Sequence, residues 1–183
     1  MMQLVKRNLT FIGLGGNLGD PALNLKEAVR LLEEKLRVEL TVSPIYRSEP
    51  VGVKEQPWFL NQAACFSDEE CIGPLTILSI LKEIETQMGR IPTVRFGPRL
   101  IDLDLLFYDN WVFNGANLVI PHPRFFERSF VLLPLLDLNP DFIDPRSQRT
   151  LQQIWEENSS SLTVCQRTGG MNQLKKLREN LKK

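Results

Sequence analysis

The stretch Gly-Pro-Arg-Leu-Ile-Asp-Leu-Asp-Leu-Leu, residues 97–106, carries two aspartates at alternate positions of an otherwise apolar run. Because successive side chains of a strand point to opposite faces, Asp102 and Asp104 are expected on one face, about 7 Å apart at ~3.3 Å per residue, with Leu103 and Leu105 in the core. Two like charges on a half-buried face repel and lose hydration, which favours a cation between them. Oxygen ligands suit a hard ion, so the pattern predicts Mg²⁺.

The alternative is an edge strand with two solvated aspartates, because Asp-x-Asp alone is a short pattern. The preceding residues favour the metal site. Gly97-Pro98 fixes where the strand begins, and Arg99 offers a bidentate fork for a phosphate three residues before Asp102. Carboxylates, cation and arginine together indicate a polyphosphate ligand.

Length and composition indicate one soluble domain, with 183 residues, 43% hydrophobic and 24% charged. The 22 basic and 22 acidic residues cancel, which argues against nucleic-acid and membrane-surface partners. Cys65, Cys71, Cys165 and the single histidine show neither zinc spacing nor a disulfide framework. Glycines interrupt the apolar stretch near the first residues, so we expect no membrane span and a cytoplasmic protein.

The order of predicted elements indicates an α+β fold of the ferredoxin-like, split βαβ type, an antiparallel sheet with helices on one face. A dinucleotide-binding fold is disfavoured, because Leu18 occupies the last glycine position of G-x-G-x-x-G and no helix separates the second and third strands. Beyond Pro140 the pattern weakens. The predicted elements are a strand at 9–14, a glycine turn at 15–19, a helix at 20–37, strands at 38–46 and 58–66, a helix at 73–89, a strand at 100–108, a hairpin turning at 109–110 with 111–113 pairing back, and a buried helix at 125–136.

Four separated segments together carry a resemblance to a known family: 11–20, 46–61, 97–106 and 121–132. They resemble the 6-hydroxymethyl-7,8-dihydropterin pyrophosphokinase family over residues 9–140, with 141–183 as a C-terminal extension of a single domain 1–183. The resemblance implies transfer of a diphosphate group from ATP to the hydroxymethyl oxygen of the pterin. The hydroxyl would attack the β-phosphorus and release AMP, a step of folate biosynthesis.

The resemblance also implies roles at the phosphate end of the site. Asp102 and Asp104 would hold two Mg²⁺ ions against the triphosphate, and activation of the hydroxyl by a metal makes a dedicated base unnecessary. Arg90 and Arg99 would act beside them in catalysis. The residues implied to bind ATP are Arg90, Arg99, Leu105, Leu118, His122 and Arg128.

For two residues near this end, the sequence leaves a structural role open as an alternative to a ligand contact. From the sequence alone, His122 between its two prolines suits a structural hydrogen bond as well as a ligand contact. Arg124 matches no implied ATP residue, and we expect Glu127 or solvent to satisfy it. In the loop between Arg90 and Gly97, Arg95 is a candidate lid contact.

A pterin ring has a guanine-like edge and two flat faces, so its pocket needs an amide and aromatic side chains. The resemblance implies that Phe59 and Phe130 sandwich the ring while Asn61 binds its edge. The remaining implied substrate contacts are Gly15, Ser48, Val51 and Asp102. The alternative is that both phenylalanines are simply core residues.

Two other functional classes compete with this hypothesis. A nucleotide-sugar transferase shares the Asp-x-Asp metal site, but it usually needs a larger domain. A non-catalytic ferredoxin-like module that binds RNA lacks support, because no RNP-like aromatic motif or basic excess is present. We therefore expect an enzyme that binds ATP and a dihydropterin and acts as a monomer.

Overall fold

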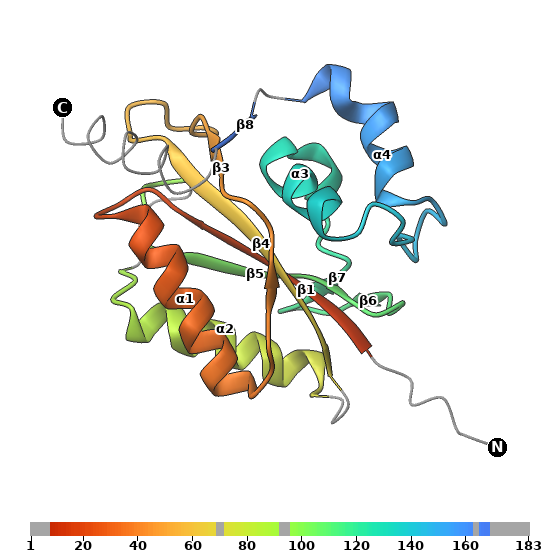
Figure 1. Ribbon diagram of the computed structural model, residues 1–183, viewed down its shortest axis with the longest axis horizontal. Coiled ribbons are helices and arrows are strands. Elements are labelled where there is room, and N and C mark those ends of the chain that lie inside the picture. Colours follow the sequence, from red (N-terminus) through yellow and green to blue (C-terminus); the bar gives the residue numbers. More distant parts are fainter. Residues whose placement is uncertain (1–7, 69–71, 92–95, 163–164, 169–183) are drawn as a thin grey trace.

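The computed structural model describes residues 8–68, 72–91, 96–162 and 165–168, and its centre is an antiparallel sheet (Figure 1). The strands follow the order β5-β1-β4-β3-β8, with β2 pairing to β4 beside β3. The fold is therefore α+β with an antiparallel sheet, as predicted. The strands are β1 (Asn8–Gly16), β2 (Thr41–Val42), β3 (Tyr46–Ser48), β4 (Phe59–Asp68), β5 (Asp102–Tyr108) and β8 (Cys165–Arg167).

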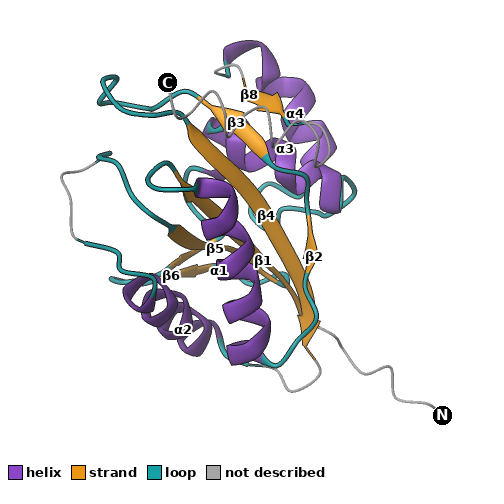
Figure 2. Cartoon of the chain, turned by 60° about the vertical axis from the view of Figure 1, so that its left-hand side comes forward, coloured by secondary structure: helices purple, strands orange, loops and turns teal. Residues whose placement is uncertain are grey.

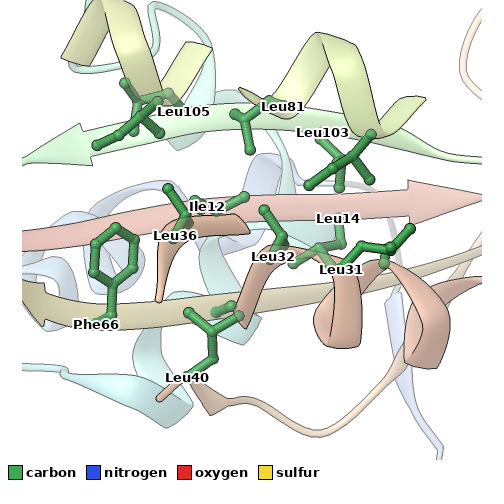
Figure 3. Packing of buried hydrophobic residues seen from close by; sticks show 14 of the residues in the cluster. Ile12, Leu14, Leu31, Leu32, Leu36, Leu40, Phe66, Leu81, Leu103 and Leu105 are labelled. Carbon is green, nitrogen blue, oxygen red and sulfur yellow. The ribbon is translucent and has the colours of Figure 1, made fainter. Parts of the chain in front are cut away.

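Helices cover both faces of the sheet, so the expectation of helices on one face was wrong. The helices α1 (Pro21–Leu36) and α2 (Pro74–Gln87) lie on one side, and α3 (Ser129–Leu138) and α4 (Leu151–Asn158) lie on the other (Figures 1 and 2). The reason is that β1 is apolar on both faces. Ile12 packs toward α1 and α2 (Figure 3), whereas Phe11 packs in a second cluster with Phe125 and Leu132.

The first helix confirms its predicted boundaries. Asp20 caps it by accepting a hydrogen bond from Leu23 N at 3.1 Å, and Pro21 occupies the first helical position, where its missing N–H costs nothing. The helix ends at Leu36, and Arg37 adopts a left-handed backbone with φ 56°. Its buried stripe, which includes Leu25 and Leu32, faces the sheet.

The glycine-rich segment after the first strand differs from its prediction. Gly15 and Gly16 form no turn but continue β1, because β4 pairs with both of them and β5 pairs with Gly15. Gly15 lies opposite Asn61 of β4 and opposite Asp102 of β5. The predicted strand at 38–46 forms only at its second half, as β2 and the start of β3.

The prediction that residues 111–113 pair back with β5 as a hairpin was also wrong. A turn forms at Asp109-Asn110, but β6 (Phe113–Asn114) pairs with β7 (Val119–Ile120) and not with β5. Other groups occupy the outer edge of β5. His122 N donates to Leu106 O at 2.8 Å, which leaves no place there for a returning strand.

The segment after Pro140 is ordered where the sequence pattern weakened. Thr150 and Gln153 form a capping box at the start of α4, a signal that the sequence carries. The short helices η1 (Phe125–Glu127) and η2 (Ser159–Ser161) flank α3 and α4. Arg95, Cys71 and residues 169–183 lie outside the described residues. No helix in the described ranges has the length and apolar character needed to cross a membrane.

Candidate active site

A cavity of about 740 Å³ opens on the side of the sheet that α3 partly covers. Residues from β1, β3, β4, β5, α2, α3 and the connecting loops line it. All but two of the predicted site residues are among them. The predicted residues that line the cavity are Gly15, Ser48, Val51, Phe59, Asn61, Arg90, Arg99, Asp102, Asp104, His122, Arg128 and Phe130.

The two predicted residues that the structure does not bring to the cavity are Leu105 and Leu118. Their side chains are buried in the core under α1 and α2. Leu105 directly follows Asp104 in a strand, so its side chain points to the opposite face. Only the main chain at these positions is left for a nucleotide contact, which stays a prediction.

The floor of the cavity explains where the two aspartates lie. Gly13 pairs with Asp104 and Gly15 pairs with Asp102, so bare backbone lies next to both carboxylates. As predicted, Leu103 between them is fully buried on the other face. A Cβ added at Gly15 would lie 3.0 Å from Asn61 Oδ1, so glycine leaves room for the amide of Asn61.

Asp102 joins two of the predicted arginines. Its Oδ2 accepts a hydrogen bond from Arg99 Nη1 at 2.7 Å, and its Oδ1 lies 2.9 Å from Arg90 Nη2. Arg90 also pairs with the buried carboxylate of Glu85. The network holds both guanidinium groups at one end of the cavity.

Glu85 and Lys82 are cavity residues that sequence reasoning missed. Leu103 N donates to Glu85 Oε1 at 2.7 Å, while Lys82 Nζ donates to Leu103 O at 3.0 Å and to Glu85 at 2.9 Å. These bonds satisfy main-chain groups on the outer edge of β5, the end strand of the sheet in the described part of the chain. Helical spacing places Glu85 beside the apolar stripe of α2, but only the tertiary structure shows that an edge strand lies there.

Asp104 differs from Asp102 in having no partner. Among the described residues, its carboxylate makes no hydrogen bond or ion pair. Burial, and then the charge of nearby Asp102, raise the pKa of Asp104 to about 6. A cation bound here would relieve both causes.

The glycine motif has a structural task that the sequence did not reveal. Asn17, which is 3% exposed, donates through Nδ2 to Gln56 Oε1 at 3.0 Å and to Pro57 O at 2.9 Å. Its Oδ1 accepts from Arg99 N at 2.9 Å. Gly16 must lack a side chain, because a Cβ there would lie 2.3 Å from Leu100 O. The motif therefore joins the segment before the aspartates to the loop at 56–57.

His122 is neutral in this environment. Its Nδ1 accepts a hydrogen bond from Arg124 N at 3.3 Å, which leaves the ring proton on Nε2. Burial, and then the charges of Arg128 and Arg124, lower the pKa of His122 to about 4. The imidazole combines the two roles that the sequence left open, a local hydrogen bond and a cavity position.

The predicted pterin residues lie together. Asn61 Nδ2 donates to Ser48 Oγ at 2.9 Å, and both residues are buried. Phe59 and Phe130 line the cavity and are only half-buried, which contradicts the alternative that both are simply core residues. Val51 lies at the cavity rim and is 44% exposed.

Arg124 also lines the cavity, and among the described residues no ion pair joins it to Glu127. Its guanidinium carbon lies 5.8 Å from the ring centre of Phe96, another lining residue. The residue type gave no signal, because an arginine four positions before Arg128 is equally typical of a solvated surface.

Comparisons with known proteins agree with this geometry. The family described as 7,8-dihydro-6-hydroxymethylpterin-pyrophosphokinase (HPPK) matches residues 11–140. The chain is 40% identical over 132 residues to the Bacillus subtilis 2-amino-4-hydroxy-6-hydroxymethyldihydropteridine pyrophosphokinase, covering 72% of this chain and 78% of the relative. It is 40% identical over 150 residues to the folic acid synthesis protein fol1 of Schizosaccharomyces pombe, covering 81% of this chain but only 20% of that protein.

Solved structures show the same fold. A crystal structure of Plasmodium falciparum HPPK-DHPS superposes with a TM-score of 0.64 at 17% identity, covering 85% of this chain and 44% of that one. The chain thus spans about a fifth of the long fungal relative but most of the bacterial one. With the family match over residues 11–140 and 40% identity to its bacterial relative, the chain belongs to the HPPK family.

Proposed function

We propose that this chain transfers diphosphate from ATP to the hydroxymethyl group of 6-hydroxymethyl-7,8-dihydropterin, giving the pterin diphosphate and AMP in folate biosynthesis. Membership of the HPPK family supports the reaction. The observation that carries it is one cavity that combines an aspartate pair, several cationic side chains and an amide flanked by aromatic rings. Each of these groups suits a different part of the two substrates.

The pterin end is formed by Asn61, Phe59 and Phe130. Because Asn61 donates one N–H to Ser48, its second N–H and its carbonyl oxygen are left for the edge of the ring. The two half-buried phenylalanines provide apolar faces for stacking. Gly15, Ser48 and Val51 complete this end.

The phosphate end suits Mg²⁺. Asp102 and Asp104 supply two carboxylates at this end of the cavity. Within the described ranges, no group of three His, Cys, Asp or Glu residues is arranged to hold a metal. Mg²⁺ is usually held by one or two carboxylates, with substrate phosphates and water at its other positions. We therefore assign two Mg²⁺ ions to this pair; when bound, they neutralise phosphate charge and make the hydroxyl more acidic.

The protein's own groups position the reaction. Arg90, Arg99 and Arg128 donate to phosphate oxygens, and neutral His122 donates through Nε2. The hydroxymethyl oxygen forms a bond to the β-phosphorus, the bond from that phosphorus to the AMP oxygen breaks, and the hydroxyl proton leaves to solvent. In-line placement and charge neutralisation are the main demands of such a transfer.

We infer the organisation that the sequence indicated, a single ferredoxin-like domain that acts as a monomer. The strand order β5-β1-β4-β3 supports a ferredoxin-like, split βαβ core. A single domain is supported because two apolar clusters share one sheet. A monomer is supported because residues of one chain line both ends of the cavity.

Incubation of the purified protein with Mg²⁺, ATP and 6-hydroxymethyl-7,8-dihydropterin tests the proposal. AMP and pterin diphosphate should appear in equal amounts by anion-exchange chromatography. Asp102→Ala and Asp104→Ala should lose turnover yet still unfold cooperatively, whereas Asp141→Ala, at an exposed position, should keep it. Absence of AMP with the wild-type protein would contradict the proposal, and Mn²⁺-dependent binding of a nucleotide sugar would favour the transferase alternative.

A further inference from the structure

The cationic side chains that line the cavity fall into two groups. Lys82 and Arg90 pair with Glu85, and Arg90 and Arg99 pair with Asp102. Among the described residues, Arg124 and Arg128 have no carboxylate within ion-pair distance. Within the part of the chain that the structure describes, the second group therefore carries positive charge that no direct ion pair neutralises.

The two unpaired guanidinium groups lie around His122. Burial, and then the charges of both arginines, lower the pKa of this imidazole. Burial, and then the charge of Arg124, also lower the pKa of Arg128. Like charges that repel inside a partly buried cavity are the electrostatic arrangement of an anion site.

Local contacts hold Arg124 at this position. Its main-chain N–H donates to His122 Nδ1, and its guanidinium carbon lies 5.8 Å from the ring centre of Phe96, within cation–π distance. Phe96 in turn packs on Gly52, where an added Cβ would lie 3.1 Å from the ring. Because the side chain lies at cation–π distance from a ring and has no acid within ion-pair distance among the described residues, its N–H donors are left for a ligand.

We propose that Arg124 is a phosphate-binding residue that contacts the polyphosphate chain of the nucleotide beside Arg128 and His122. This inference rests on the proposed function and extends it, because Arg124 is not among the residues that the sequence assigned to ATP binding. The ligand group is a di- or triphosphate, whose oxygens accept from a guanidinium fork and carry the opposite charge. The side chain also connects the phosphate site to Phe96 and, through it, to the loop around Gly52.

The test compares Arg124→Gln and Arg124→Lys with Arg146→Gln as the matched control. Arg146 also lowers the pKa of His122 and lies over an aromatic ring, but it lies 3.6 Å from the Asp144 carboxylate and does not line the cavity. Calorimetry in Mg²⁺ should measure the Kd of a non-hydrolysable ATP analogue and of inorganic tripolyphosphate. Loss of a charge-assisted hydrogen bond predicts that Arg124→Gln weakens both about ten- to a hundredfold.

The other readouts separate binding from structure. Arg124→Lys should recover part of the affinity because it restores the charge without the fork. Arg146→Gln should bind both probes like the wild-type protein, and the KM for the pterin should not change in any variant. Affinity of Arg124→Gln within twofold of wild type, or a loss for the analogue but not for tripolyphosphate, would overturn the inference. Wild-type protein that binds tripolyphosphate through Arg124 but makes no AMP would instead refute the proposed function alone.

Discussion

Replacing Asn17 by alanine tests how the glycine motif organises the site. The side chain is almost fully buried and makes three hydrogen bonds, to Gln56 Oε1, to Pro57 O and from Arg99 N. They join the loop between β3 and β4, which carries the proposed substrate contact Val51, to the segment that enters β5. Asn17→Ala removes all three bonds.

The expected loss follows from these bonds. At about 1 kcal/mol of net stability for each hydrogen bond, the variant should be about 3 kcal/mol less stable. For a chain of this length, that corresponds to a fall in melting temperature of roughly 6–12 °C. Because the loop between β3 and β4 loses its two bonds to Asn17 and keeps the bond from Gln56 Nε2 to Phe96 O, the KM for the pterin should rise more than the KM for ATP.

Thermal unfolding by circular dichroism and steady-state assays of AMP formation measure the two effects. Asn158→Ala is the matched control, because Asn158 makes one bond, to Ile154 O at 2.7 Å, at the far end of α4. Asn17→Asp keeps the acceptor for Arg99 N but cannot donate to Pro57 O, so it should be at least as damaging as alanine. If Asn17→Ala melts with the wild-type protein and keeps its pterin KM, the anchoring role assigned to Asn17 is wrong.

Three further predictions address charge and packing. Asp104→Asn should raise the melting temperature at pH 8 in the absence of metal. The folded-state pKa of Asp104 is about 6, above the ordinary value of 3.8, so the ionised carboxylate destabilises the fold, and the wild-type protein regains stability as the pH falls through 6. A lower melting temperature for the variant would contradict this. The wild-type protein should lose stability as the pH falls from 6.5 toward about 4, since the unfolded chain binds a proton at His122 that the folded one excludes, and His122→Gln should remove this loss. Urea titrations at several pH values measure the free energy of unfolding of both proteins. An equal dependence of that free energy on pH in the two proteins would refute the prediction. Leu32→Ala, at a fully buried position, should lower the free energy of unfolding in urea by about 3 kcal/mol. Leu75→Ala, at a position that is 61% exposed, should lower it by less than about 1 kcal/mol, as is usual for a surface change. Similar losses in the two variants would show that the core assignment is wrong.

Some elements were readable from local sequence because their signals are local. Asp20 and Pro21 mark the start of α1, and the alternation from Leu103 to Leu105 places both aspartates on one face. The capping box at Thr150 carried the same kind of signal for α4. The predicted turn at the glycine segment was wrong at its start, because pairing with β5 as far as Gly15 and with β4 as far as Gly16, which no local pattern reveals, extended β1.

The sequence by itself determined the side of β5 on which the carboxylates lie and the start of the first helix. These follow from the two-residue period of a strand and from capping. The residues of the proposed pterin pocket were implied by the resemblance to a family, and their role there stays a prediction. Only the tertiary structure decided that Asp102 binds two arginines while Asp104 has no hydrogen bond or ion pair among the described residues. It also decided that Glu85 and Lys82 bond to the edge of β5 and that Arg124 reaches the cavity. The physical reason is that hydrogen bonding, burial and charge pairing depend on distances between residues far apart in the chain, which local pattern does not encode.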